Sequence, residues 1–188
     1  MAAPRMDPEL TETMKFLARH PQVRMRIPAP RDKTVVYSGG FASPGAGTVA
    51  QYHAAWRLLA QAKASDPKQF DYVTLEERLR QFHVVQLGES LFDHANRLSA
   101  ALERRGVGPQ AMFLWRALSG IYVQGAQGKV RALILPGDRI GQSVFHLTEV
   151  KVLLRDDVLR RISLDPATLR DFRVTVQAGL VPAPIVVM

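Results

Sequence analysis

The hydrophobic pattern of the chain changes period at Gly128, and this change constrains the fold more than any other feature. Before Gly128 apolar residues recur at helical spacing, whereas after it they alternate or run continuously, as they do in strands. Four later segments predict β-strands, with a short helix, "DPATLRDF", between the second and the third: "KVRALIL", "SVFHLTEVKVL", "FRVTVQA" and "APIVVM". Helices followed by strands indicate an α/β protein of two lobes, with a ligand in the cleft between them.

Capping residues mark the helices of the first part of the chain. Asp7 followed by Pro8 predicts the start of a first helix, and residues 47–63 have the apolar stripe of an amphipathic helix. The later helices are expected to begin at Thr74 (with Glu77 as a capping box), at Ser90 and at Pro109, the last running until Gly128.

Two segments are predicted to be irregular. Residues 21–33, "PQVRMRIPAPRDK", are expected to form an extended, proline-punctuated linker, and "SGGFASPGAG" a flexible loop after the β-like run "TVVY". We therefore expect an N-terminal helix and linker over residues 1–33, and one domain over residues 34–188. Within that domain, residues 34–108 would form the helical lobe and residues 109–188 the α/β lobe.

Composition limits the partners and the compartment. The 25 Lys and Arg residues exceed the 17 Asp and Glu residues, and the net charge of +8 favours nucleic acid, anionic small molecules such as nucleotides, or an acidic protein. The chain has no Cys, so packing must stabilise it, and a reducing compartment suits it. Charges occupy the N-terminal segment where a signal peptide needs an apolar run, and no run of about 18 apolar residues occurs, so we expect a cytoplasmic protein without a membrane partner.

Motifs for several kinds of chemistry are missing from the sequence. It contains no P-loop, no dinucleotide glycine fingerprint, no HExxH, no GxSxG and no zinc-ligand spacing, and its five His residues form no close ligand pair. We therefore expect no metal site. One residue does stand out: Glu149 places a carboxylate among the apolar residues of "SVFHLTEVKVLL". Such a charge is costly unless it is paired, so it either lies at a strand end in solvent or is held for a purpose.

A set of residues in a particular order points to a purpose. Trp56 lies 20 positions before Glu76 in "TLEE", Trp115 and Ser119 are one helical turn apart in "LWRALS", and Glu149 closes "SVFHLTEV". This ordered set, over roughly residues 50 to 155, resembles the ADP-ribosyl cyclase / NAD glycohydrolase family. Its members share a tryptophan ahead of "TLE", a W-x-x-x-S helix, and an S-x-F-x-x-x-E-V strand that ends in the catalytic glutamate. Animal members are rich in disulfides, so the resemblance is to a cysteine-free, bacterial relative.

The resemblance implies a fold and a set of roles. The fold would be ADP-ribosyl-cyclase-like, with the helical lobe packed on a small, Rossmann-like, mostly parallel sheet. Glu149 would be the catalytic residue, holding the ribose hydroxyls and opposing the positive charge that develops on the ribose. Glu76 would accept a hydrogen bond from the carboxamide and help to decide between hydrolysis and cyclisation. Trp56 and Trp115 would flank the nicotinamide ring, and Ser119 would donate to ribose or phosphate.

Three residues next to these candidates are also expected to contact the substrate. Arg57, next to Trp56, would meet a phosphate, and Val144 and Phe145 would line the ribose side of the pocket. Val144 is too small to stack on adenine, which disfavours cyclisation. The resemblance therefore implies an NAD(P) glycohydrolase that forms nicotinamide and ADP-ribose with minor cyclic ADP-ribose, using NAD as substrate and no cofactor.

The sequence leaves three alternative functions open. An NAD-degrading enzyme would serve as the toxin module of an interbacterial effector, delivered into the cytoplasm of a target cell by a secretion system, with an acidic immunity protein as its partner. The alternative is a basic nucleic-acid-binding or RNA-cleaving protein, which the net charge of +8 and residues His83 and His94 support. Against it, the basic residues are spread along the chain and aromatics make up only 7% of it. A third alternative is a non-catalytic nucleotide sensor of the same fold.

Overall fold

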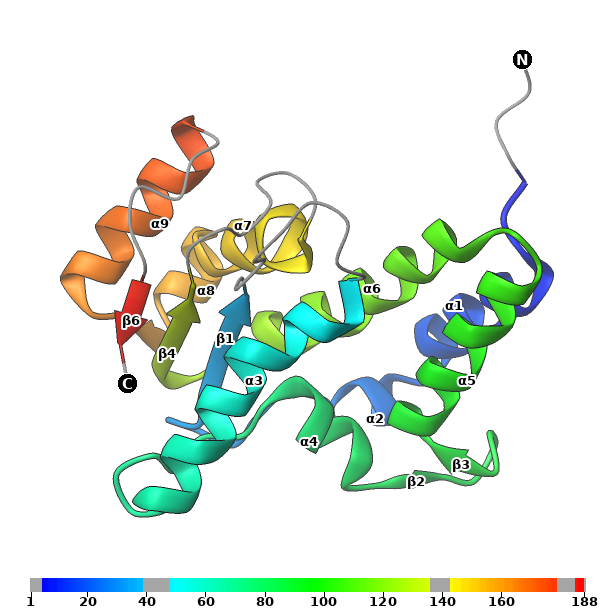
Figure 1. Ribbon diagram of the computed structural model, residues 1–188, viewed down its shortest axis with the longest axis horizontal. Helices are drawn as coiled ribbons and strands as arrows, with labels where there is room; N and C mark the ends of the chain where they lie inside the picture. Colours follow the sequence, from blue (N-terminus) through cyan, green and yellow to red (C-terminus); the bar gives the residue numbers. More distant parts are fainter. Residues whose placement is uncertain (1–4, 39–47, 136–142, 179–184, 188) are drawn as a thin grey trace.

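The computed structural model describes residues 5–38, 48–135, 143–178 and 185–187, and the segment predicted as a glycine-rich loop lies almost entirely outside them. The described residues form a mixed α/β fold that is mainly helical around one small sheet (Figure 1). None of the helices among these residues is long and apolar enough to cross a membrane.

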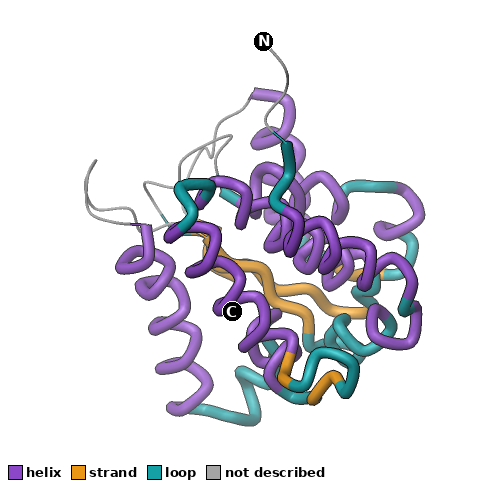
Figure 2. The backbone as a smooth tube through the Cα atoms, turned by 90° about the vertical axis from the view of Figure 1, so that its right-hand side faces the viewer, coloured by secondary structure: helices purple, strands orange, loops and turns teal. Residues whose placement is uncertain are grey.

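The sheet has parallel strands in the order β1 (Thr34–Ser38), β4 (Gly128–Ile134), β5 (Ile162–Ser163). Strand β6 (Ile185–Val187) runs antiparallel beside the second half of β4. The predicted strands "KVRALIL" and "APIVVM" are thus confirmed, and so is the β-like run that contains β1. The residues of β4 are buried with one exception, as expected for a central strand with helices on both faces. Figure 2 shows the strands between helices.

Helices make up most of the remainder. Strands β2 (His83–Val84) and β3 (Glu89–Ser90) pair antiparallel and form a separate hairpin. The α-helices are α1 (Pro8–Arg19), α2 (Pro21–Arg24), α3 (Thr48–Ser65), α4 (Leu75–Arg80), α5 (Leu91–Arg104), α6 (Ala111–Gln124), α7 (Val150–Leu153), α8 (Asp156–Leu159) and α9 (Pro166–Ala178). A 3-10 turn, η1 (Gly108–Gln110), precedes α6, and a π-helical turn, η2 (Phe145–Glu149), precedes α7. The predicted caps are confirmed at Asp7, at the capping box of Thr74 and at Ser90.

The two faces of the sheet carry separate apolar clusters. Val35 of β1 and Leu133 of β4 pack with Leu59 of α3, whereas Val36 of β1 belongs to the larger core that also contains Leu118 of α6. This division follows from strand geometry, because successive side chains point to opposite faces. Strand β1 comes from the predicted helical lobe and pairs with β4 of the predicted α/β lobe, so the sheet joins the two parts of the chain.

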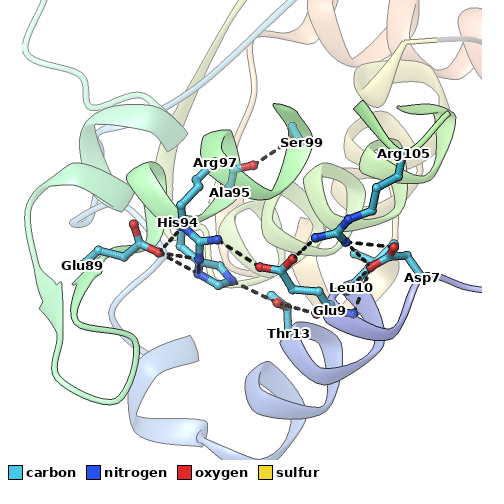
Figure 3. Close-up of polar contacts among 10 residues, drawn as sticks. All are labelled: Asp7, Glu9, Leu10, Thr13, Glu89, His94, Ala95, Arg97, Ser99 and Arg105. Atoms are coloured by element: carbon cyan, nitrogen blue, oxygen red, sulfur yellow. Dashed lines mark hydrogen bonds and ion pairs between the residues drawn. The ribbon is translucent and has the colours of Figure 1, made fainter. Parts of the chain in front are cut away.

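The N-terminal helix is integrated into this core. Leu10 and Leu17 of α1 are buried, and α1 is held to α5 by ion pairs and by a hydrogen bond between Thr13 and His94 (Figure 3). The prediction of an extended linker over residues 21–33 is partly wrong, because its first residues form α2 and both Val23 and Ile27 are buried. These two apolar residues anchor the segment, which the prolines alone did not indicate.

Two predicted strands are wrong. The segment "SVFHLTEVKVL" forms η2 and α7, with buried residues at positions 145, 149, 150 and 153, which is the spacing of one helix face. The segment "FRVTVQA" is the second half of α9, where Thr168, Phe172 and Thr175 are buried while Val174 and Val176 are more than a third exposed. In both segments β-branched residues suggested strands, and tertiary packing overrode that propensity.

Candidate functional site

The candidate site lies where β1 ends, beside the π-helical turn that carries Glu149. In open α/β sheets, ligands bind at the carboxyl ends of the parallel strands. The turn η2 packs against both β1 and α6, which brings Glu149 to this end of the sheet. Ser38, the last residue of β1, is buried, and its Oγ has no hydrogen-bond partner among the described residues.

Glu149 is a buried carboxylate, with 8% of its surface exposed. The hydroxyl of Ser119 on α6 donates a short hydrogen bond to its Oε1. One turn earlier on α6, Arg116 Nε donates to Thr148 Oγ1 over 3.0 Å, which fixes the neighbouring residue of η2. In a π-helical turn the backbone hydrogen bond spans five residues instead of the four of an α-helix, and such turns are frequent at functional sites. Glu149 is therefore held inside the protein by a defined donor, and of the two alternatives that the sequence left open, the strand end in solvent is wrong.

Glu76 provides a second carboxylate. It lies in the first turn of α4, which Thr74 and Glu77 cap. The hydroxyl of Tyr37 on β1 donates to Glu76 Oε1 over 2.5 Å, whereas Glu76 Oε2 is buried and has no partner among the described residues. A buried carboxylate oxygen without a donor is costly and is rare in native proteins, so it indicates a place where a ligand can donate.

Tyr37 connects the two carboxylates. Burial raises the pKa of the Tyr37 phenol well above its usual range, and the charge of Glu76, its hydrogen bond, and the charge of Glu149 raise that pKa further. The charges of both glutamates act on this phenol, and Glu76 also accepts its hydrogen bond. Tyr37 therefore remains protonated and acts as a hydrogen-bond donor at the site.

Tyr122 of α6 fixes the position of α4 relative to β1. Its buried hydroxyl accepts from Val35 N over 3.0 Å and donates to Val73 O over 2.6 Å. Burial raises the pKa of Tyr122, so the hydroxyl stays protonated. Val73 also donates its amide to Lys33 O over 2.8 Å, so the segment that leads into α4 runs along the edge of β1. The position of Glu76 thus depends on the junction that Tyr122 forms between β1 and the segment before α4.

The other predicted site residues lie in different settings. Trp115 packs against the main core, and its Nε1 donates to Ser99 Oγ of α5 over 3.2 Å. Phe145 is buried, with its ring centroid 5.4 Å from that of Phe172. The remaining three are more open: Trp56 is 36% exposed on α3, Arg57 is exposed beside it, and Val144 is half-buried next to η2. The structure thus joins Ser119 to Glu149 and Tyr37 to Glu76, whereas the side chains of Trp115 and Phe145 are engaged with neighbouring helices.

Sequence reasoning missed Tyr37 and Tyr122. The only signal for Tyr122 is a tyrosine inside the apolar helical stretch "SGIYV", where a buried hydroxyl needs a partner. Tyr37 gives no signal, because tyrosine is common in strands. Within the residues that the structure describes, no group of three His, Asp or Glu side chains could hold a metal ion.

Comparison of the chain with protein families, with curated proteins and with solved structures found no match in any of the three. We therefore argue the function from the residues of the site.

Proposed function

We propose that the protein is an NAD glycohydrolase with an ADP-ribosyl-cyclase-like fold, in which Glu149 is the catalytic carboxylate. The observation that carries the proposal is the buried Glu149 carboxylate, bound by Ser119 at the carboxyl end of β1 and close to the Tyr37–Glu76 pair. In NAD the nicotinamide is already a cationic leaving group, so its departure needs no general acid. The reaction requires stabilisation of an oxocarbenium-like ribose, and a carboxylate shielded from water provides this most effectively.

The reaction would consume one water for each NAD. As the bond between the ribose and nicotinamide nitrogen breaks, its electron pair leaves with the neutral nicotinamide. Glu149 stabilises the positive charge on the ribose until water adds to the same carbon and loses a proton, giving ADP-ribose. Ser119 orients Glu149, since it occupies one of its oxygens. Under this proposal Ser119 acts on Glu149 and not directly on ribose or phosphate.

Glu76 fits the role of a carboxamide acceptor. Its Oε1 is engaged by Tyr37, and its Oε2 is a buried acceptor with no donor among the described residues. The amide group of nicotinamide would supply that donor. Trp56 would provide an aromatic face for the ring and Arg57 a charge for a phosphate, both from the exposed side of α3. Trp115 and Phe145 would support the site through the core.

The setting that we propose is a toxin module that acts in the cytoplasm of a target cell, because uncontrolled NAD cleavage harms any cell that contains it. An acidic immunity protein would complement the net charge of +8. The RNA-cleaving alternative is less well supported. His94, one of its two histidines, is 6% exposed and hydrogen-bonded to Thr13 and Glu89, so it is not presented to a substrate.

The test is nicotinamide release from NAD by the purified protein, followed by chromatography. Glu149→Gln should lower the rate by about two orders of magnitude or more, the scale of losing one preorganised electrostatic group. Glu103→Gln, at an exposed position on α5, is the matched control and should be unaffected. Absence of release by folded wild-type protein, or near-normal release by Glu149→Gln, would overturn the proposal.

A second variant tests the carboxamide role. Tyr37→Phe should keep the fold but lower kcat/KM by about tenfold, since it removes the donor that orients Glu76. ADP-ribose should be the main product of the wild type, and both Tyr37→Phe and Glu76→Ala should raise the fraction of cyclic ADP-ribose measured by mass spectrometry. A merely structural role of Tyr37 would lower the rate without changing this product ratio, and that outcome would remove Glu76 from the proposed site.

A further inference from the structure

A groove of about 350 Å³ lies between α2 and the β2–β3 hairpin, outside the candidate site. Its floor is apolar, because Val23, Phe82 and Val84 line it and are buried. The groove is separated from α7, which follows Glu149: in Figure 1 the hairpin lies at the lower right, whereas α7 lies near the middle of the upper part. The proposed NAD chemistry therefore makes no use of it.

One arginine without an acidic partner among the described residues lines this floor, and three more lie near it in the sequence or in contact with it. Arg26 lines the groove with its guanidinium carbon 4.1 Å from the centroid of the Phe82 ring, and Arg78 donates to the backbone carbonyl of Arg26 over 2.5 Å. Burial and then the charge of Arg26 lower the pKa of Arg78, and Arg78 Nε is buried without a partner among the described residues. Arg24 and Arg80 flank the lining residues in the sequence. Within the described part of the chain, none of these four arginines pairs with a carboxylate.

Some basic residues elsewhere in the described chain pair with carboxylates, whereas Arg116 donates to a hydroxyl and Arg161 to a backbone carbonyl. Arg97 on α5 pairs with Glu9 and Glu89, Arg105 just after α5 pairs with Asp7 and Glu9, and Lys63 pairs with Glu77. The groove thus concentrates positive charge that the described residues do not neutralise. Charge complementarity favours an acidic partner.

The surface beside the groove is also apolar. Met25, next to Arg26, is 81% exposed, and Val85, which lines the groove, is 84% exposed. Exposed apolar residues around a hollow are typical of protein-binding surfaces. Nucleic acid suits the groove less well, because single-stranded binding needs open aromatic faces for bases, and Phe82 is buried beneath Arg26.

We infer that this groove docks a short segment of a partner protein in which acidic side chains accompany apolar ones. Its apolar side chains would contact Val85 and the floor, and its carboxylates would pair with Arg26, whose guanidinium has the planar geometry that carboxylates match, while Arg78 adds positive charge beside it. This inference stands whether or not the protein cleaves NAD.

The experiment measures fluorescence anisotropy of labelled short probes with the full chain. The probes are a peptide in which glutamate alternates with leucine, the same peptide with lysine in place of glutamate, a glutamate–serine peptide, and a single-stranded oligonucleotide. The glutamate–leucine peptide should bind most tightly. Arg26→Glu should weaken it at least tenfold, whereas Arg173→Glu, an exposed arginine on α9, should leave it unchanged.

The variants also distinguish the contributions to binding. Val85→Asp should weaken binding of the same peptide at least tenfold, although it leaves the arginines unchanged. If circular dichroism shows that Arg26→Glu does not fold, Val85→Asp provides the test. Equal binding of the glutamate–serine peptide would remove the apolar contact from the inference. Preference for the oligonucleotide, equal loss in Arg173→Glu, or no binding of the glutamate–leucine peptide would overturn it.

Discussion

Replacement of Tyr122 by Phe tests the junction on which the candidate site depends. The change removes one oxygen and leaves the ring in the core. It leaves two buried backbone groups without their partner, because Val35 N–H donates to this hydroxyl over 3.0 Å and Val73 C=O accepts from it over 2.6 Å. An unsatisfied buried polar group costs about 1–3 kcal/mol. We therefore expect Tyr122→Phe to lower the free energy of unfolding by about 3 kcal/mol, with part of the double cost relieved by relaxation.

Tyr72→Phe is the matched control. Tyr72 is also buried, but its hydroxyl donates a single bond, over 2.5 Å, to Leu59 O of α3. Loss of one such bond should cost about 1 kcal/mol. Equilibrium unfolding in urea measures both changes, and similar m-values would show that the unfolded states are comparable. Equal destabilisation by the two variants, or a loss below about 1 kcal/mol for Tyr122→Phe, would refute the reasoning.

Two further predictions concern the strand starts and the docking of α1. Gly128→Ala should destabilise the fold by about 2–3 kcal/mol in urea unfolding, because φ of Gly128 is +68° and an added Cβ would lie 2.0 Å from Asp32 Oδ1. The control is Gly88→Ala, which should cost only about 1 kcal/mol of backbone strain, because φ is +71° and nothing lies within 4 Å of the added atom. Equal losses of stability in the two variants would contradict this prediction. Hydrogen bonds from Arg105 and Arg97 lower the pKa of Glu9, so its stabilising contribution is complete above the unfolded pKa of about 4.3 and is lost as the pH falls through the lower folded pKa. The loss of stability caused by Arg105→Ala should therefore shrink between neutral pH and about pH 3, and a constant difference would show that the ion pairs of Arg105 in Figure 3 contribute nothing.

The sequence predicted elements well where local chemistry decides them. Asp7, Thr74 and Ser90 accept from the first amides of their helices, and this depends only on neighbours within three residues. Strand β4 was predictable because its mostly apolar run starts at Gly128 and has the short length that is typical of a strand. In these cases the local preference and the final environment agree.

Prediction failed where packing partners decide the conformation. The run around Phe145 is compatible with a strand or a buried helix, and apolar period alone does not separate the two in short segments. Contacts of η2 with α6 and of α7 with α9 select the helix. In α9 the helix buries Phe172 and leaves Val174 exposed, whereas a strand would have placed them on one face.

The candidate site shows the same division between local and long-range information. Residue types and order singled out Glu149 and Ser119, but nothing in the sequence pairs them, because they are 30 positions apart and meet only through the packing of η2 on α6. The W-x-x-x-S spacing does place Trp115 and Ser119 on one helix face. The structure directs that face to two neighbours: the indole bonds to α5 and the hydroxyl to Glu149. A single face of α6 therefore links the helical core to the buried carboxylate, and the Ser119 hydroxyl, which was expected to donate to ribose or phosphate, donates to Glu149.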